Sequence, residues 1–348
     1  MASSVQTPPA RRARPAPVAR LVGVAALSVG VLVVVAALSI VVGARAIDPG
    51  TVLRILLHPG GTDELSLIVL DGRVPRTLVG IVAGAALGVA GAVMQGVTRN
   101  PLADPGILGI NAGAALAVVV GIVVFGIGST GAYLPFAFAG AAVAAIVVYG
   151  IASAGRRGPT PVGLALSGAV VAAALASVTT AVQLLDASVL DQLRFWQVGG
   201  LDGRGLGVVG VVAVPIAIGL ALALALGRSL NTLALGDELA ASLGQHVMLT
   251  RGLGALASVL LAGAATAAVG PIGFVGLAVP HAVRRFTGPD NRWVLPLSAI
   301  VAPSLLLVAD VIGRVIAFPG EVPVGIVTAF IGAPVFIALV RGRTARAL

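Results

Sequence analysis

The sequence predicts an all-α integral membrane protein with about ten transmembrane helices. Its 348 residues are 58% hydrophobic, 10% charged and have a mean hydropathy of +1.08, whereas a soluble domain carries about a quarter charged residues. The apolar residues are mostly Ala, Val, Leu and Ile, with 47 Gly and 4% aromatic residues. This composition is typical of closely packed membrane helices and not of an outer-membrane barrel with aromatic girdles.

The elements follow from the apolar runs in chain order. Residues 1–20 are rich in Pro, Ala and Arg without a periodic apolar face, which predicts a disordered cytoplasmic tail. The run 21–43 is long enough to cross a ~30 Å hydrocarbon core and too long for the core of a cleavable signal peptide. Further spans are expected at 77–97, 107–126, 134–153, 162–185, 205–226, 247–269, 271–284, 293–313 and 323–340. Residues 21–343 therefore form one transmembrane domain, followed by a short cytoplasmic tail at 344–348.

Two connections are expected to be helical. Residues 186–204 place Phe195 and Trp196 beside charges, which suits an interfacial helix on the outer face. Residues 228–244 carry Leu233, Leu235, Leu239 and Leu243 around Asp237 and Glu238. This pattern indicates a short amphipathic helix on the cytoplasmic side, with Asp237 as its N-cap.

The charges fix a topology and exclude several functions. All 22 basic residues are Arg, and without Lys the chain cannot form a Walker A loop. Zero Cys excludes disulfides and thiolate chemistry. With the N-terminus inside, fifteen Arg lie on the cytoplasmic side and seven outside, so both termini are expected in the cytoplasm. The basic excess then reflects membrane topology, and no nucleic-acid partner is expected.

The predicted spans contain few groups that could do chemistry. Buried charges in membranes persist where they are used, but the acids lie almost wholly in loops, and Asp310 stands four residues before Arg314, at ion-pair spacing. The three His have no metal-ligand or catalytic spacing, so neither catalytic nor metal-binding residues are predicted. An ion-coupled transporter and a membrane enzyme are the disfavoured alternatives. Uncharged polar residues in the spans fit interhelical hydrogen bonds or a neutral pathway.

A family resemblance adds to this interpretation. Residues 73–109, RVPRTLVGIVAGAALGVAGAVMQGVTRNPLADPGILG, resemble the FecCD family of permeases, as do LALGDELAASLG at 233–244, residues 270–296 and residues 309–340. The resemblance implies a type II ABC importer permease fold in the bacterial inner membrane, surrounded by lipid. It also implies a dimer with a second copy or a homologue, two separate ATPase subunits that bind ATP and Mg, and a substrate-binding lipoprotein or periplasmic protein. No cofactor is expected on this chain. Ferric siderophore is the favoured cargo, with cobalamin and haem as alternatives.

The resemblance also assigns candidate residues. Docking of the binding protein is expected at Arg73, Arg76 and Arg314, although interfacial snorkelling or an Asp310–Arg314 pair would also explain them. A coupling helix at about 234–244 would seat in the ATPase through Gly236, Asp237, Glu238, Ala240 and Gly244, unless it is an ordinary amphipathic connector. The pathway is expected to include Asn100, Leu102, Asn111, Thr160, Ser167 and Thr328. Leu102 matches a cytoplasmic gate, with simple helix packing as the alternative, and Pro101 and Pro105 should break the helix there.

Overall fold

The computed structural model describes residues 18–43, 45–154, 159–318 and 320–344. The predicted tails therefore lie outside the described residues, apart from 18–20 and Thr344. Ten helices correspond to the ten predicted spans: α1 (Val18–Val41), α4 (Val74–Thr98), α5 (Ile110–Phe125), α6 (Thr130–Ser153), α7 (Pro161–Leu185), α9 (Leu206–Ala225), α12 (Val247–Val269), α13 (Val275–Thr287), α14 (Asn291–Ile316) and α15 (Val324–Thr344). The described chain is helical without strands, as the composition predicts.

Seven of the described helices are long and apolar enough to cross a membrane, and α5 and α15 contribute shorter apolar helices. At 1.5 Å per residue, the 16 residues of α5 span about 24 Å. This span begins later than predicted because Pro105–Leu108 form a 3₁₀ turn, η2, and Gly109 has a φ of +73°. The eighth span, α13, is also short, since Gly270–Phe274 precede it as non-helical backbone.

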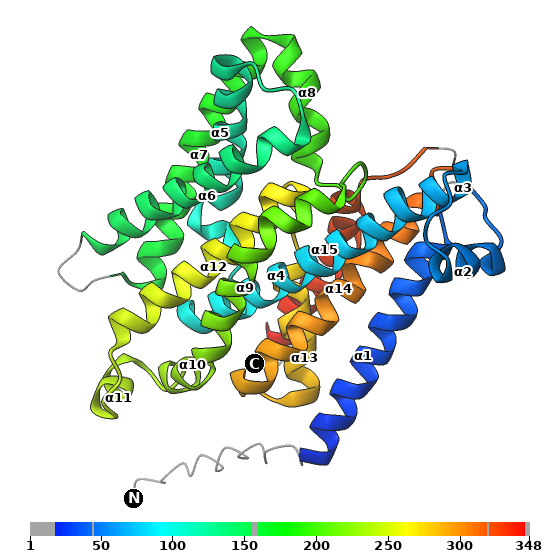
Figure 1. Ribbon diagram of the computed structural model, residues 1–348. Helices are drawn as coiled ribbons and strands as arrows, with labels where there is room; N and C mark the ends of the chain where they lie inside the picture. The colour runs from blue at the N-terminus through cyan, green and yellow to red at the C-terminus, as the bar shows by residue number, and fades with distance from the viewer. Residues whose placement is uncertain (1–17, 44, 155–158, 319, 345–348) are drawn as a thin grey trace, which may run out of the picture.

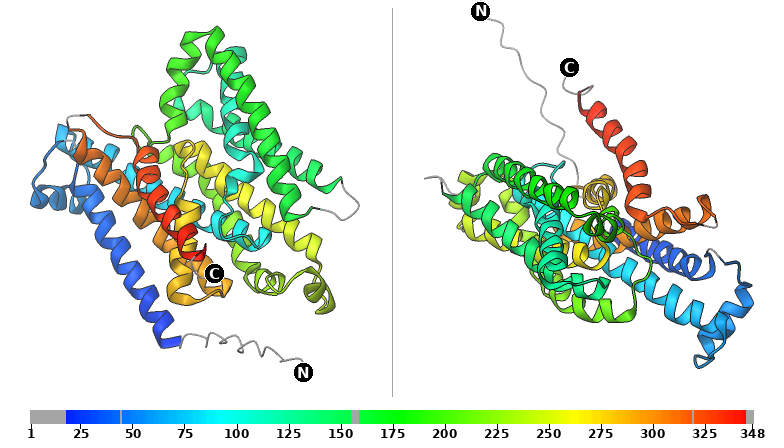
Figure 2. Two further views of the ribbon diagram at one scale, coloured as in Figure 1. Left: turned by 180° about the vertical axis from the view of Figure 1, so that it is seen from behind. Right: turned by 90° about the horizontal axis from the view of Figure 1, so that it is seen from above.

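The core forms around α4 and α12, which are mostly buried and pack against α14, α13 and α9. Small residues allow this close packing. A Cβ on Gly91 of α4 would lie only 1.9 Å from the carbonyl oxygen of Gly276 in α13. By contrast, α1 lies at the edge of the bundle (Figure 1) and α15 projects from it in the view from above (Figure 2).

Successive spans alternate in direction and define two ends of the bundle (Figure 1). The α8 end carries α2 (Pro49–Leu57), α3 (Glu64–Leu67), the π-helix η1 (Ile68–Arg73), α8 (Ala187–Val198) and the connection from α14 to α15. The α11 end carries α10 (Gly227–Leu233), α11 (Asp237–Ser242) and the connections that follow α4 and α13. The interfacial helix predicted within 186–204 is α8, whereas α2, α3 and η1 were not expected from the sequence.

Candidate functional sites

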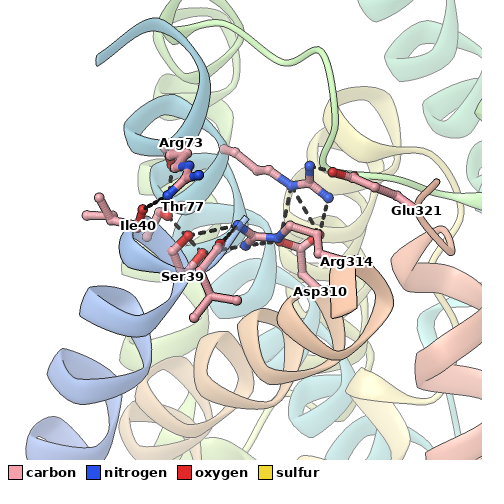
Figure 3. A network of polar contacts seen from close by, with 9 residues as sticks. Ser39, Ile40, Arg73, Thr77, Asp310, Arg314 and Glu321 are labelled. Atoms are coloured by element: carbon pink, nitrogen blue, oxygen red, sulfur yellow. Dashed lines mark hydrogen bonds and ion pairs between the residues drawn. The ribbon is translucent and has the colours of Figure 1, made fainter. Parts of the chain in front are cut away.

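A polar cluster at the α8 end joins α1, α4 and α14 (Figure 3). We call Arg73, Arg76, Asp310, Arg314 and Glu321 the arginine cluster. The side chains of Asp310 and Arg314 are each only 2% exposed, so these charges are compensated inside the protein. A buried charge without such partners would be strongly unfavourable.

Asp310 is the common acceptor of the arginine cluster. Arg76 donates from Nη2 to Oδ1 at 2.7 Å and from Nε to Oδ2 at 3.1 Å. Arg314 donates from Nη2 to Oδ2 at 2.5 Å. One carboxylate on α14 therefore binds guanidinium groups from α4 and α14, through charge-assisted hydrogen bonds.

Two arginines of the cluster donate hydrogen bonds to the C-terminal end of α1. Arg314 Nη1 donates to the carbonyl oxygens of Ser39 at 2.8 Å and Val42 at 2.6 Å. Arg73 Nη1 donates to those of Ile40 at 3.0 Å and Val41 at 2.5 Å. The last carbonyls of a helix lack intrahelical donors and attract positive charge. Arg73 and Arg314 therefore fix the end of α1 against η1 and α14.

Arg76 is the cluster arginine that reaches toward solvent. Its side chain is 15% exposed, and its Nη1 lies 2.7 Å from Glu321 Oε2, on a side chain that is 30% exposed. Glu321 stands on the connection from α14 to α15 (Figure 3) and is more exposed than Asp310, so this ion pair is the solvent-facing contact of Arg76.

The structure thus separates the three arginines for which docking was predicted. Arg73 and Arg314 are 6% and 3% exposed as whole residues, and both are engaged within the chain. The Asp310–Arg314 pair considered as an alternative is present. Arg76 alone of the three has an exposed acidic partner.

At the opposite end, the predicted coupling helix is α11, preceded by the separate helix α10. Asp237 Oδ1 lies 2.9 Å from Arg251 Nη2 and 3.4 Å from Arg99 Nη2. Arg251 also donates to the carbonyl oxygen of Pro159 at 3.2 Å. These contacts tie α11 to α12, to the end of α4 and to the segment before α7.

The prediction that Asp237 is the N-cap was wrong. Gly236 is the N-cap, with φ of +109°, and no side chain caps the helix. A residue with a side chain rarely adopts this conformation, so the chain turns at the glycine and Asp237 becomes the first helical residue. Its carboxylate is then free to bind the two arginines.

The faces of α11 differ sharply in burial. Ala240 is fully buried, whereas Leu239 is 58% and Leu243 is 67% exposed; Glu238 is exposed as well. Gly244 ends this segment with φ of +82°, and Gln245 Nε2 then donates to the Ser229 carbonyl oxygen at 2.9 Å. The segment is therefore held against the bundle while presenting leucines outward.

The predicted pathway residues do not all meet in one place. Asn100 and Leu102 lie in the connection after α4, where Asn100 Oδ1 accepts from the Leu102 N–H at 3.0 Å. As predicted, the helix stops there: Arg99 is left-handed, with φ of +51°, and irregular backbone continues to η2. Thr160, also toward the α11 end, is the N-cap of α7. Its side chain accepts from the Gly163 N–H.

Deeper in the bundle, α7 contacts the η2 connection beside Ser167. A Cβ on Gly168 would lie 1.7 Å from the Ile107 carbonyl oxygen, and Ser167 is half-buried next to this contact. Asn111 accepts a hydrogen bond from Thr266 of α12 at 3.0 Å. Thr328 lies near the α8 end and donates to its own helix at Gly325. Asn111 and Thr328 thus make the internal hydrogen bonds of ordinary span residues.

Several polar contacts were not foreseen from the sequence. Asp104 lines a small cavity with Asn111, Thr266 and Gly276, and its carboxylate accepts from the Gly106 N–H at 2.8 Å. The only signal was its position between Pro101 and Pro105, where a loop enters the bundle.

A second unforeseen contact joins α10 to α14. Asn231 Nδ2 donates to Asp290 Oδ1 at 2.6 Å, and Asn231 Oδ1 accepts from the Asn291 N–H at 2.8 Å. Hydrogen bonds from Arg292 and Asn231 lower the pKa of Asp290 from 3.8 to about 2. The link connects the segment beside α11 with a long helix of the core.

Within the described ranges, no group of three or more His, Cys, Asp or Glu is placed to hold a metal ion. What the fold offers is a bundle of membrane helices, an exposed helix at one end and an arginine cluster at the other. These features define a multi-pass membrane protein. The chain belongs to the FecCD transport family, whose model matches residues 31–342.

Curated relatives extend over nearly the whole chain. It is 49% identical to the ferric enterobactin transport system permease protein FepD of Escherichia coli, covering 90% of this chain and 93% of that protein. It is 47% identical to the Fe(3+)-citrate import system permease protein YfmD of Bacillus subtilis, over 87% and 90% of the two chains. The cobalamin import system permease protein BtuC of Halobacterium salinarum is 38% identical over 84% and 78%.

Solved structures support the same fold. An inward-facing metal-chelate-type ABC transporter matches with a TM-score of 0.78 and 26% identity, covering 93% of this chain and 98% of that one. PsaBC from Streptococcus pneumoniae matches with a TM-score of 0.57 and 16% identity over 83% and 94%; this second likeness concerns the fold alone.

Proposed function

We propose that this chain is the permease subunit of an ABC importer that moves a ferric siderophore across the inner membrane. The observation that carries the proposal is the 49% identity to the ferric enterobactin permease FepD across 93% of its length. Relatives named for hemin and cobalamin are 37% and 38% identical, which makes haem and cobalamin the alternative cargoes.

The α11 end faces the cytoplasm in this proposal. The elements at that end carry Arg20, Arg99, Arg228, Arg251, Arg284, Arg285 and Arg292, and cytoplasmic loops of membrane proteins are enriched in basic residues. The α8 end then faces outward, and both termini are cytoplasmic.

Two ATPase subunits, which bind ATP and Mg, would drive a permease dimer formed with a second copy or a homologue. We assign their seat to the coupling helix around α11, with Gly236, Asp237, Glu238, Ala240 and Gly244. Leu239 and Leu243 are exposed there, and exposed apolar side chains outside a membrane are typical of a partner-binding surface. The ion pairs of Asp237 would transmit motion of this helix to α12 and α4.

An extracytoplasmic binding protein would dock at the α8 end. Because Arg73 and Arg314 are buried and donate to acceptors within the chain, we assign them to holding the docking surface in shape. Arg76 is the residue that can exchange Glu321 for a carboxylate of the binding protein, since that ion pair reaches solvent.

The pathway assignment rests on the connection after α4 and on α5, α7 and α15. We retain Asn100, Leu102, Asn111, Thr160, Ser167 and Thr328 as proposed lining residues, with Leu102 at the cytoplasmic gate. Irregular backbone inside a membrane protein is tolerated where it is buried or lines a cavity, and the connection around Leu102 and η2 is of this kind.

The test is uptake of labelled cargo in a strain that lacks this gene, with and without the restored wild-type protein. Ferric siderophore uptake should depend on the protein and collapse on ATP depletion, while labelled cobalamin and haem uptake stay unchanged. If only cobalamin or haem responds, the cargo is wrong. If uptake is abolished by a protonophore while ATP is held constant, the ABC mechanism is wrong.

The docking assignment needs its own variants. Arg76→Glu should reduce binding-protein affinity and uptake, while Arg54→Glu, at an exposed position of the same end, should leave both unchanged. Equal effects of the two substitutions would remove the special role of Arg76.

A further inference from the structure

Arg204 is a buried cation without a hydrogen-bond partner. It lies between α8 and α9, is 8% exposed, and its Nε and Nη1 atoms have no acceptor. Burial lowers the pKa of its guanidinium, and the charge of Asp202 raises it, yet no ion pair forms between the two. Because Arg stays protonated in proteins, the group is a positive charge that still lacks an acceptor.

The other arginines of the α8 end differ from Arg204 in this respect. Arg45 pairs with Glu64, Arg54 donates to Thr51, and Arg194 pairs with Asp191. Arg76 and Arg314 pair with Asp310, and Arg73 donates to carbonyl oxygens at the end of α1. Among the described arginines of this end, Arg204 is therefore the one whose guanidinium makes neither a hydrogen bond nor an ion pair.

The segment that carries Arg204 is fixed against the core. The Gly200 N–H donates to the Val269 carbonyl oxygen of α12 at 2.8 Å. The Gly199 carbonyl oxygen accepts from the Gly325 N–H of α15 at 3.1 Å. Leu201 is fully buried. The backbone just before Arg204 is thus hydrogen-bonded to two spans, α12 and α15.

The residues directly after Arg204 add a second attraction for negative charge. They begin α9, a 20-residue helix whose N-cap is Gly205 and which has no side-chain cap. A Cβ on Gly203, Gly205 or Gly207 would meet nothing within 4 Å, so the space beside this helix start is open. Free N–H groups and the helix dipole favour anions at such a terminus.

We propose that Arg204 and the N-terminus of α9 bind an oxyanion of the cargo chelate as it enters from the α8 end. This inference rests on the proposed function, because it takes the cargo to be a ferric chelate. A tris-catecholate complex of Fe³⁺ is trianionic, whereas a tris-hydroxamate complex is neutral. Comparing these two cargoes therefore tests whether the charge of the chelate matters. Arg204 is buried whereas Arg45 and Arg194 are exposed, so a docked protein would meet those two side chains first.

The first experiment measures binding without transport. The purified permease with its ATPase subunits, free of nucleotide and binding protein, is unfolded thermally with and without ferric enterobactin. Ferric enterobactin should raise the wild-type midpoint, Arg204→Gln should lose this shift, and Arg204→Lys should keep part of it because a point charge remains without the planar fork. Arg194→Gln, a matched change at an exposed site, should behave like wild type.

The second experiment measures uptake by the same variants. Arg204→Gln should lower ferric enterobactin uptake about tenfold, the expected effect of a lost charged hydrogen bond, and leave neutral ferric tris-hydroxamate uptake unchanged. The midpoints without ligand show whether each variant folds.

The outcomes separate this inference from the proposed function. An equal ligand shift in wild type and Arg204→Gln, or no shift in wild type, overturns the anion site. A variant that keeps the shift but binds the binding protein more weakly assigns Arg204 to docking instead. If wild type takes up no ferric chelate, the proposed function fails, while the thermal comparison still decides the role of Arg204.

Discussion

Removal of Asp310 is expected to destabilise the protein more than any single change in the exposed part of the arginine cluster. Its carboxylate accepts from two guanidinium groups, and Arg314 beside it is almost fully buried. Asp310→Ala leaves Arg314 as a buried charge whose remaining acceptors are neutral oxygens of α1. Breaking a buried ion pair on one side costs about 3–5 kcal/mol.

Glu321→Gln is the matched control. Glu321 is 30% exposed and contacts the same Arg76, so its loss should cost less than ~1 kcal/mol, as for other solvent-accessible ion pairs. At roughly 2 °C per kcal/mol for a chain of this size, Asp310→Ala should lower the unfolding midpoint by roughly 6–10 °C and Glu321→Gln by no more than about 2 °C.

The assay is thermal unfolding in detergent, followed by tryptophan fluorescence, together with a double-mutant cycle. Asp310→Asn, Arg314→Gln and the double variant should show a coupling energy above about 1 kcal/mol, as expected for residues in one network. If Asp310→Ala shifts the midpoint no more than Glu321→Gln, or if the cycle shows no coupling, the reasoning about the buried charge is refuted.

Three further variants test other parts of the structure. Gly91→Leu should abolish stable insertion because even its Cβ would collide with a carbonyl of α13. Gly150→Ala, in open space on α6, should be neutral or stabilising by about 0.5–1 kcal/mol. Membrane expression and unfolding midpoints compare the two variants. Asp237→Asn should reduce ATP-driven uptake severalfold by loosening α11 from two arginines, and unchanged coupling of ATP hydrolysis to uptake would count against that role. Because the pKa of Asp290 is lowered in the folded protein to about 2, its carboxylate adds stability above pH 3.8 that disappears as the pH falls towards about 2. Asp290→Asn should therefore lower the free energy of unfolding by about 1 kcal/mol at pH 7, after allowance for solvent screening, and leave it unchanged below pH 2.

The sequence was sufficient to predict the helices because hydrophobicity is a property of each segment by itself. A run such as 247–269 must be buried in lipid or protein wherever it lies, and α12 has those bounds. Once the spans are placed in chain order, the connections between them alternate between arginine-rich and arginine-poor. The helices α2, α3 and η1 were missed because they are short and mixed in polarity, so their stability depends on the surface on which they pack.

The partners of the polar side chains were decided only by the tertiary structure. Arg76 and Asp310 are 234 residues apart, and Arg314 meets the α1 carbonyl oxygen of Ser39 across 275 residues. The four-residue spacing in the sequence indicated only the local Asp310–Arg314 pair. Likewise, the turn at Gly236 released Asp237 from the predicted capping role.

The sequence by itself determined the class of the protein, the order of its spans and its family. Only the tertiary structure showed that Arg73 and Arg314 are buried and bound within the chain and that Arg204 is buried without an acceptor. The physical reason is that membrane insertion sums over neighbouring residues, whereas the state of a charged side chain depends on the few atoms that packing brings within about 3 Å of it.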